Sequence, residues 1–309
     1  MSSPPAVSIV DLLKTYGQRR ALDGVSLDIS AGSRTVVLGH NGSGKSTLLE
    51  IIATLRVPSS GTVRIDGHDA VARARDARRL IGLTPQSNAL DPLVTPAEVL
   101  DFQGAALGMG RAAAARRRDE LLDLLGLAEH RKTRIAKLSG GTRRKVDLAV
   151  ALVAEPPIVI LDEPTTGLDP MSRLGFWEEL KRLNGEGRTL VVSTQDLHEA
   201  DVLATDVIVL REGKVAAHAA PEVLKRRVGE RALTIELNTA PAAQHFVSSA
   251  AEPFRPDPQD ERTLHLALAA GPAALRAALG DLGAHGEDVT TLRLAEPSLD
   301  DVFVALATR

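Results

Sequence analysis

A glycine-rich run between a strand-like and a helix-like segment constrains this chain more than any other feature. Residues 39–47 read GHNGSGKST, which fits the pattern G-x-x-x-x-G-K-[ST]. The apolar residues 35–38 before it predict a strand, and the apolar residues 48–55 after it predict a helix. Glycines let such a loop turn its backbone N–H groups inward, and the start of the helix adds its positive dipole end. The run therefore predicts a loop that binds a polyphosphate.

Each residue of this loop is a candidate phosphate contact. In this interpretation Lys45 reaches the β- and γ-phosphates of a nucleotide, and the hydroxyl of Ser46 ligates a magnesium ion. The alternative is a glycine turn that only caps a helix, and the strand-loop-helix context argues against it. The candidate residues are Gly39, His40, Asn41, Gly42, Ser43, Gly44, Lys45, Ser46 and Thr47.

Two adjacent carboxylates at the end of an apolar run form a second candidate group. Residues 158–164 read IVILDEP, so a buried strand would deliver Asp162 and Glu163 at its carboxyl end, where α/β folds bind ligands. Asp162 can hold magnesium through water, and Glu163 can polarise the water that attacks a γ-phosphate. A lone pair of this kind would more often be a solvated strand end. Beside a phosphate loop it predicts a metal ligand and a general base.

A serine followed by two glycines opens a later helical run. Residues 138–142 read LSGGT, and residues 143–154 continue with a helical pattern. The sequence permits two interpretations. One is a serine cap on an ordinary helix, and the other is a second phosphate-binding helix N-terminus made by Ser139, Gly140 and Gly141. One nucleotide rarely needs two such ends from the same subunit.

Strand-like and helix-like segments alternate along the chain, which predicts an α/β core with a partly parallel sheet. Between residues 88 and 140 the pattern turns helical and predicts an inserted helical subdomain. A charged run at 225–230 predicts a boundary between a domain at 1–224 and a small α+β domain at 225–309. The predicted strands cover residues 7–13, 25–29, 35–38, 62–65, 80–83, 158–161, 190–193, 207–210, 232–237, 263–268 and 289–294.

Composition and charge argue against several classes of protein. The chain has no cysteine, so disulfides and cysteine-ligated metals are excluded. Its formal net charge is −3, and its basic clusters lie on helical patterns mixed with acidic residues and without interleaved aromatics, which predicts no binding to nucleic acid. We also expect no signal peptide, because no basic stretch leads into an apolar core at the N-terminus, and no membrane span, because charged residues and prolines interrupt the most apolar window.

Taken in order, these motifs resemble the ATP-binding cassette of ABC transporters. The resemblance spans roughly residues 7–222 and rests on Tyr16, GHNGSGKST, Gln86, LSGGT, ILDEP and Gly167-Leu168-Asp169. It implies an ABC-type P-loop NTPase fold, in which a RecA-like mixed sheet carries the inserted helical subdomain. It also implies that the chain binds ATP and Mg²⁺ and hydrolyses ATP.

The same resemblance implies roles for three further residues. Two of them have a structural alternative: Tyr16 could be a surface-loop aromatic before Gly17, and Gln86 a turn residue after Pro85. Tyr16 would stack on adenine. Gln86 would contact magnesium and link the nucleotide site to the helical subdomain and to a permease. Asp169 would communicate across a head-to-tail homodimer, in which ATP lies between the phosphate loop of one subunit and the serine and glycines of LSGGT of the other.

Finer features resemble the daunorubicin/doxorubicin-resistance type of ABC exporter ATPase. They include IGLTPQ at 81–86, RRKVDLA at 143–149, STQ at 193–195 and EPSLDDVF at 296–303. This resemblance implies an ATPase subunit at the cytoplasmic side of the membrane, where a separate integral-membrane permease of the ABC-2 type exports a small, hydrophobic or drug-like compound. Two alternatives stay open: an ABC ATPase of the translation or DNA-repair type without transport, and a cassette that only binds nucleotide.

Two positions depart from the pattern of the family. Gln195 stands where most ABC ATPases have a histidine that contacts the γ-phosphate, and we interpret it as a sensor of that phosphate and a catalytic residue beside Glu163. His198, three residues later, would fall in the first turn of a helix. Thr142 stands where glutamine is usual, and we expect little loss from this change because Ser139 and the two glycines are retained.

A capped helix is predicted at the end of the chain. Ser298 would be its N-cap, and Asp301, three residues later, would complete a capping box. The apolar face could pack on its own domain or on a partner subunit. That face consists of Leu299, Val302, Phe303 and Leu306.

Overall fold

The computed structural model divides the chain into two compact units, Met1–Pro221 and Glu222–Arg309. It describes residues 4–86, 90–228, 231–249, 254–257, 260–268, 276, 279–280, 288–295 and 298–307. Residues 88–89 of the predicted helical subdomain and residues 229–230 of the predicted boundary run lie outside the described residues.

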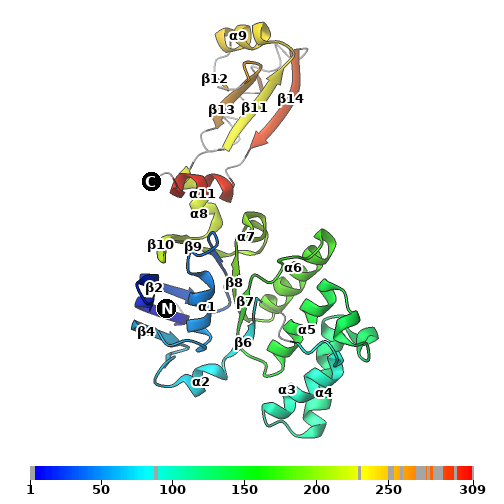
Figure 1. Cartoon of the computed structure of the whole chain (residues 1–309). Helices are drawn as coiled ribbons and strands as arrows, with labels where there is room; N and C mark the ends of the chain where they lie inside the picture. Colours follow the sequence, from blue (N-terminus) through cyan, green and yellow to red (C-terminus); the bar gives the residue numbers. More distant parts are fainter. Residues whose placement is uncertain are drawn as a thin grey trace. The chain divides into compact units, whose positions relative to one another are not determined.

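A six-stranded sheet in the order β10-β9-β3-β8-β7-β6 forms the centre of the first unit (Figure 1). All neighbouring strands in it are parallel except β9 and β10, which form an antiparallel pair. This confirms the predicted α/β core with a partly parallel sheet. The strands are β3 (Arg34–Leu38), β6 (Ile81–Thr84), β7 (Ile158–Asp162), β8 (Thr189–Thr194), β9 (Asp206–Arg211) and β10 (Lys214–Ala219).

This strand order determines where the site can form. β3 pairs with β8, and β8 pairs with β7, so the carboxyl ends of these three strands lie side by side at one edge of the sheet. The glycine-rich loop follows β3, Asp162 ends β7, and Gln195 comes directly after β8. Segments that are more than 100 residues apart in the sequence (39–47 and 162–163) therefore meet at this edge, as expected for ligand sites of parallel α/β sheets.

A second, antiparallel sheet contributes to the same hydrophobic core. Its order is β2-β1-β4-β5, from strands β1 (Pro5–Tyr16), β2 (Arg19–Ser30), β4 (Ser60–Ile65) and β5 (His68–Asp69). Helix α1 (Lys45–Ile52) lies between the two sheets, because one buried cluster contains its apolar residues together with residues of both sheets (Figure 1). The helix has the predicted length but begins and ends three residues earlier than predicted: it ends before Thr54, whose φ of 58° is left-handed.

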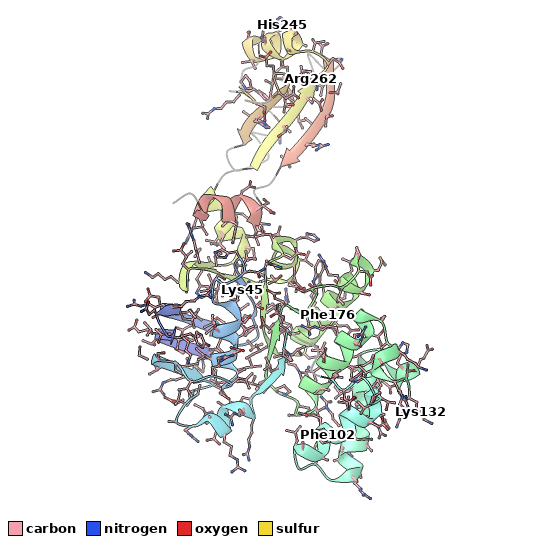
Figure 2. All side chains as sticks on the ribbon, in the orientation of Figure 1. Lys45, Phe102, Lys132, Phe176, His245 and Arg262 are labelled. Carbon is pink, nitrogen blue, oxygen red and sulfur yellow. The ribbon has the colours of Figure 1, made fainter. Side chains whose placement is uncertain are left out.

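The predicted helical region consists of short helices and turns. They are α3 (Pro96–Ala106), α4 (Arg111–Leu124), η1 (Ala128–His130) and η2 (Ile135–Lys137), followed by α5 (Gly140–Leu152). Thr95 and Glu98 form a complete capping box at the start of α3. Gly104 lets α3 approach α4 closely, since a Cβ there would lie 2.8 Å from the Cβ of Ala114. Phe102 on α3 is 72% exposed, whereas Phe176 on α6 (Pro170–Gly185) is buried (Figure 2).

The second unit is a small α+β unit, as predicted. Its antiparallel sheet has the order β12-β13-β11-β14. Residues of α9, among them Phe246, share a buried cluster with residues of this sheet, and Phe246 packs edge-to-face on Phe254. Helix α8 spans the boundary between the two units. The elements are α8 (Pro221–Val228), β11 (Arg231–Leu237), α9 (Ala240–Ser249), β12 (Arg255–Pro256), β13 (Thr263–Leu268), β14 (Val289–Ala295) and α11 (Leu299–Ala307).

The capping box predicted for the final helix is confirmed. The backbone N–H of Ser298 donates to Asp301 Oδ2 at 2.8 Å, and the backbone N–H of Asp301 donates to Ser298 Oγ at 3.2 Å. Leu299 and Val302 are buried within the chain, and Phe303 is half-buried. The chain's own packing therefore covers part of the apolar face.

Candidate functional site

The glycine-rich loop closes against strand β2 and the start of α1. Gly44 is the N-cap of α1 and has a φ of 108°, which is left-handed. A Cβ at this position would lie 2.5 Å from the carbonyl oxygen of Ala21 and 2.9 Å from Leu22 Cδ2. Only glycine fits such a backbone at such a distance. The loop is therefore held tightly against β2, with the N-terminal N–H groups of α1 at its end.

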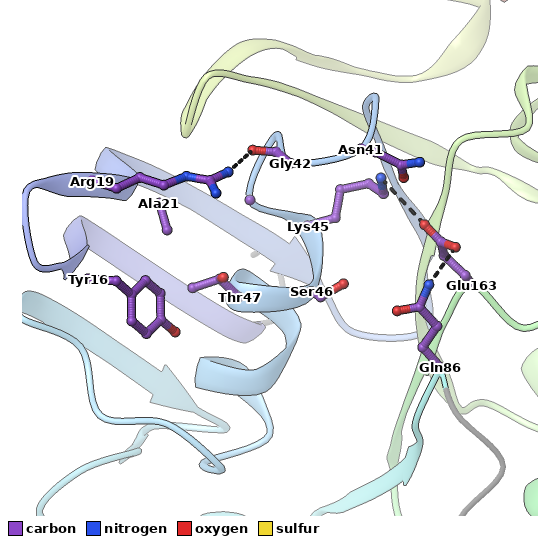
Figure 3. A pocket seen from close by; sticks show the side chains of 11 residues that line it. Tyr16, Arg19, Ala21, Asn41, Gly42, Lys45, Ser46, Thr47, Gln86 and Glu163 are labelled. Carbon is purple, nitrogen blue, oxygen red and sulfur yellow. Dashed lines mark hydrogen bonds and ion pairs between the residues drawn. The ribbon is translucent and has the colours of Figure 1, made fainter.

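A pocket of about 410 Å³ opens beside this loop (Figure 3). Nine of its lining residues are predicted site residues that come from four separate segments of the chain. Two lining residues, Arg19 and Ala21, belong to β2 and were not predicted; Arg19 Nη2 donates to the carbonyl oxygen of Gly42 at 3.3 Å. The nine are Tyr16, Asn41, Gly42, Gly44, Lys45, Ser46, Thr47, Gln86 and Glu163.

Three residues of the loop, Gly39, His40 and Ser43, do not line the pocket. Gly39 and Ser43 are buried, and His40 contributes its backbone. Lys45 Nζ donates to the carbonyl oxygens of Gly39 and His40, at 2.7 and 3.2 Å. The same ammonium lies 3.6 Å from Glu163 Oε1, and Lys45 is only 4% exposed. A buried positive charge thus lies where the loop and the carboxylates meet.

The two carboxylates lie at the end of β7 and are both buried. Asp162 Oδ1 accepts hydrogen bonds from Ser46 Oγ at 3.3 Å and from the hydroxyl of Ser193. Glu163 has a left-handed φ of 46°, and its backbone N–H donates to the carbonyl oxygen of Ser193 at 3.1 Å. Glu163 Oε2 accepts from Gln86 Nε2 at 2.9 Å (Figure 3). β8 therefore fixes the backbone of Glu163, and Gln86 fixes its side chain.

The donor set beside the loop fits a magnesium ion. A hydroxyl on Ser46 and a carboxylate on Asp162 are hard oxygen ligands, which Mg²⁺ prefers. Among the described residues, no three His, Cys, Asp or Glu side chains form a group that could hold a metal by themselves. Mg²⁺ usually keeps several waters and binds through one or two protein ligands and phosphate oxygens, so the sparse set here suits it.

Tyr16 lies at the mouth of the pocket, at the end of β1. Its side chain is 42% exposed, and its ring has Lys14 Nζ at 5.2 Å and the guanidinium carbon of Arg56 at 5.6 Å from its centre. Flat, partly exposed rings stack on bases, and such stacking contributes roughly 1–3 kcal/mol. The placement suits contact with the base of a nucleotide whose phosphates lie in the loop.

The serine and glycines of LSGGT lie outside this pocket. Ser139 is the N-cap of α5, and its Oγ accepts from the backbone N–H of Thr142 at 3.1 Å. Ser139 and Gly140 are exposed. Gly141 lies so close to Ser172 that a Cβ there would be 2.7 Å from Ser172 Oγ. The start of α5 is therefore exposed, and Ser139, Gly140 and Gly141 are not among the residues that line the pocket of their own chain.

Asp169 caps the next helix close to this end of α5. It is exposed, is the N-cap of α6 and accepts from the backbone N–H of Ser172 at 2.9 Å and from its hydroxyl at 2.6 Å. These hydrogen bonds lower the pKa of the Asp169 carboxyl below its ordinary value. Ser172 thus links Asp169 to Gly141.

Gln195 and His198 have different surroundings. Gln195 is exposed at the carboxyl end of β8 and does not line the pocket. His198 is the second residue of α7 (Leu197–Leu203), in its first turn, and packs edge-to-face on Trp177 at 5.4 Å between ring centres. The sheet edge therefore carries Gln195, while His198 faces an aromatic ring of α6.

Two buried charged residues next to the site were missed by sequence reasoning. Glu199 accepts from Thr165 Oγ1 at 2.8 Å and from Trp177 Nε1 at 3.0 Å, and burial raises its pKa. Arg144 on α5 is 5% exposed. Its position fits the apolar face of the helix, four residues before buried Leu148, and this spacing is the one sequence signal that could have identified it.

Fold and site together define a P-loop nucleoside triphosphatase: a glycine loop after the parallel strand β3, a buried lysine, and two carboxylates at the end of β7, which is separated from β3 by β8. Residues 22–166 match the ABC transporter family model. The chain is 36% identical to the daunorubicin resistance ATP-binding protein DrrA3 of Streptomyces coeruleorubidus, over 97% of this chain and 95% of the relative. It is 33% identical to the doxorubicin resistance ATP-binding protein DrrA of Mycobacterium tuberculosis, over 98% and 94%.

Solved structures that resemble this chain are also ATP-binding cassettes of ABC transporters. The chain matches the ATP-binding cassette MJ0796, in a dimeric post-hydrolysis state bound to ADP and Pi, with a TM-score of 0.63 and 32% identity over 69% of this chain and 98% of that chain. It matches cbiO1 from Clostridium perfringens, part of the ABC transporter complex cbiONQ, with a TM-score of 0.67 and 28% identity over 73% and 95%. The chain belongs to the ATP-binding subunits of the ABC transporter family. It binds ATP, has the ABC-type P-loop NTPase fold, and is the ATPase subunit of an ABC exporter.

Proposed function

We propose that this chain powers export of a small, drug-like compound of the daunorubicin or doxorubicin kind through a separate membrane permease. The observation that carries the proposal is the extent of the likeness to the resistance proteins, which covers 97% of this chain and includes the C-terminal unit. A likeness of the cassette alone would not distinguish an exporter from other ABC ATPases. Neither an ABC ATPase of the translation or DNA-repair type nor a cassette that only binds nucleotide receives such support.

The nucleotide-binding residues are proposed as the sequence assigns them. The backbone N–H groups of residues 39–47 cradle the triphosphate, Lys45 neutralises its charge, and Tyr16 stacks on adenine. The pocket beside the loop and the partly exposed ring of Tyr16 that lines it support this assignment. Ser46, Gln86 and Asp162 would hold Mg²⁺, which when bound spreads the charge of the β- and γ-phosphates.

Glu163 is the proposed general base. Its carboxylate lies between Lys45 and Gln86 in a buried position, where it can accept a proton from a water molecule attacking the γ-phosphate. Gln86 orients the carboxylate by donating a hydrogen bond to Oε2 of Glu163, while Oε1 of Glu163 faces Lys45. When a nucleotide takes the lysine as its partner, that oxygen is available to the water.

A head-to-tail homodimer would complete the site. Ser139, Gly140 and Gly141 form an open helix N-terminus that is suited to an anion and lies outside the pocket of its own chain. We assign them to the nucleotide of a second copy, with Asp169 close to the same boundary. The related cassette MJ0796 is a dimer with ADP and Pi, which supports this arrangement.

The permease is the proposed membrane partner. Among the described residues, no helix combines the length and the apolar content that a membrane crossing requires. We place the chain at the cytoplasmic side of the membrane, bound to an ABC-2 type permease and to no nucleic acid. We also propose that its functional domains are residues 1–224, with 88–140 as helical subdomain, and 225–309.

Inside-out vesicles test the transport function. Vesicles that contain the full chain and the integral-membrane protein that co-purifies with it should take up doxorubicin when ATP and Mg²⁺ are added, measured as loss of its fluorescence. Vesicles with Glu163→Gln should not take it up, because uptake depends on hydrolysis. ATP hydrolysis by the parent without any uptake of doxorubicin would contradict the proposed substrate class.

The role of Gln195 can be separated from that of His198. We expect Gln195→Ala to lower kcat by about 3- to 10-fold, because one neutral hydrogen bond contributes roughly 0.5–1.5 kcal/mol. His198→Ala should hydrolyse ATP within about twofold of the parent, since its ring contacts Trp177 and not the pocket. Steady-state hydrolysis by both variants checks this. If His198→Ala were crippled while Gln195→Ala kept the parent rate, the two roles would be reversed.

A further inference from the structure

Arg144 binds three main-chain carbonyls of the two loops that carry Gln86 and Glu163. Its Nε donates to the carbonyl oxygen of Pro164 at 2.7 Å, Nη1 to that of Pro85 at 2.9 Å, and Nη2 to that of Asp162 at 3.0 Å. Pro85 immediately precedes Gln86, and Asp162 and Pro164 flank Glu163. One buried guanidinium thus holds the backbone on both sides of the proposed base and next to its glutamine partner.

We propose that Arg144 is a positioning residue for ATP hydrolysis, which fixes Glu163 and Gln86 relative to each other. The inference rests on the proposed role of Glu163 as the base. Arg144 does not line the pocket itself, so it acts through the two loops and not on the nucleotide.

The sheet alone does not hold these loops together. The last pair between β6 and β7 is Thr84 with Leu161, so the carbonyls of Pro85 and Pro164 lie beyond the ladder that joins these two strands. Proline has no backbone N–H, and neither Pro85 nor Pro164 can donate a hydrogen bond of its own. Arg144 supplies the donors that the ladder lacks at this point.

Arginine suits this position for a geometric reason. The guanidinium is planar and presents its donors in a rigid fork, so one side chain can reach three acceptors in three directions. Lysine has a single ammonium on a flexible stem and cannot reproduce this spacing. Asp147, one turn further along α5, lies 3.7 Å from Nη1 and offsets the buried charge.

The same side chain links the site to helix α5. Arg144 follows Ser139 by five residues, on the helix whose open N-terminus is assigned to the nucleotide of a second copy. A displacement of this helix would move the guanidinium and, with it, the carbonyls that flank Glu163. The positioning role therefore connects the two halves of the proposed site through one residue.

The experiment compares substitutions at neighbouring positions in the full-length chain. We expect Arg144→Lys and Arg144→Gln to lower kcat for ATP on the order of 10- to 100-fold, as misplacements of about 1 Å do, and to leave KM and the affinity for a fluorescent ATP analogue within about threefold. Lys145→Gln removes the same charge from the next residue, which is partly exposed and lies 3.9 Å from Glu179, and should keep the parent kcat. Thermal unfolding of each variant shows whether it is folded.

Two results would overturn the positioning role. One is a folded Arg144→Gln variant with the parent kcat, and the other is a parallel loss of kcat and nucleotide affinity, which indicates a general structural role. If Arg144→Gln does not fold, Arg144→Lys and the double variant that combines it with Glu163→Gln test the positioning role instead. Arg144→Lys should add no further loss to single-turnover hydrolysis by Glu163→Gln, and a further multiplicative loss would overturn the inference. If Glu163→Gln itself hydrolysed ATP at the parent rate, the proposed base would be wrong, independently of Arg144.

Discussion

Glu163→Gln is expected to reduce kcat for ATP by roughly 10²–10⁴-fold, the usual contribution of a general base. Glutamine has nearly the same size and can keep a hydrogen bond with Gln86, but it cannot accept the proton of the attacking water. Lys45 and the loop are untouched, so nucleotide affinity should be retained. Single-turnover hydrolysis with Mg²⁺-ATP and binding of a fluorescent ATP analogue measure the two quantities separately.

Glu178→Gln provides the matched control for this substitution. Glu178 is an exposed residue of α6 whose carboxylate pairs with Lys181, so the same chemical change occurs away from the pocket. This variant should hydrolyse ATP at the parent rate. Equal rates for Glu163→Gln and the parent would remove Glu163 from the reaction and leave the chain without its proposed base.

Gly44→Ala is expected to weaken ATP binding by roughly 100-fold or more. Its Cβ would meet the Ala21 carbonyl oxygen at 2.5 Å and Leu22 at 2.9 Å, so the loop must move away from β2. The φ of 108° adds backbone strain on the order of 1–3 kcal/mol. Displacing the backbone N–H groups from their common centre removes the phosphate cradle. Titration with the fluorescent ATP analogue checks the affinity.

Gly32→Ala separates strain from displacement. Gly32 also has a left-handed φ, 71°, but a Cβ there would have no atom within 4 Å, and the residue lies in the turn before β3. This variant should lose only about 1–2 kcal/mol of unfolding free energy and bind ATP like the parent. If both glycine variants bound ATP normally, the close contact between the loop and β2 would not matter for the cradle.

Local patterns in the sequence predict the parts of this site that are continuous in the chain. The glycine loop and the carboxylates after β7 each lie in one short segment, whose hydrophobic pattern also predicts the adjoining strand. These predictions need only neighbouring residues. The contact between Gln86 and Glu163 joins residues 77 positions apart. The family resemblance suggested a role for Gln86 at the nucleotide site, but not this contact.

Other features depend on packing that no local pattern encodes. The strand order places β3 between β8 and β9, which is decided by pairing across the whole sheet. β10 was missed because its half-buried residues include only one β-branched side chain. In the run Arg143-Arg144-Lys145 the sequence shows three similar charges. Helical spacing from Leu148 favours burial of the middle one, but only the structure shows that it binds carbonyls.

The left-handed backbone at position 163 favours side chains other than the one that the proposed chemistry requires. At a φ of 46° glycine or asparagine would be less strained than glutamate, and a β-branched or bulky residue would be more strained. A library of all substitutions at this position, sorted once for yield of folded protein and once for ATP turnover, would rank the side chains in different orders. Glutamate at this position is explained by the proposed role of its carboxylate as the base, and the neighbouring strand and Arg144 supply hydrogen bonds that stabilise the backbone there.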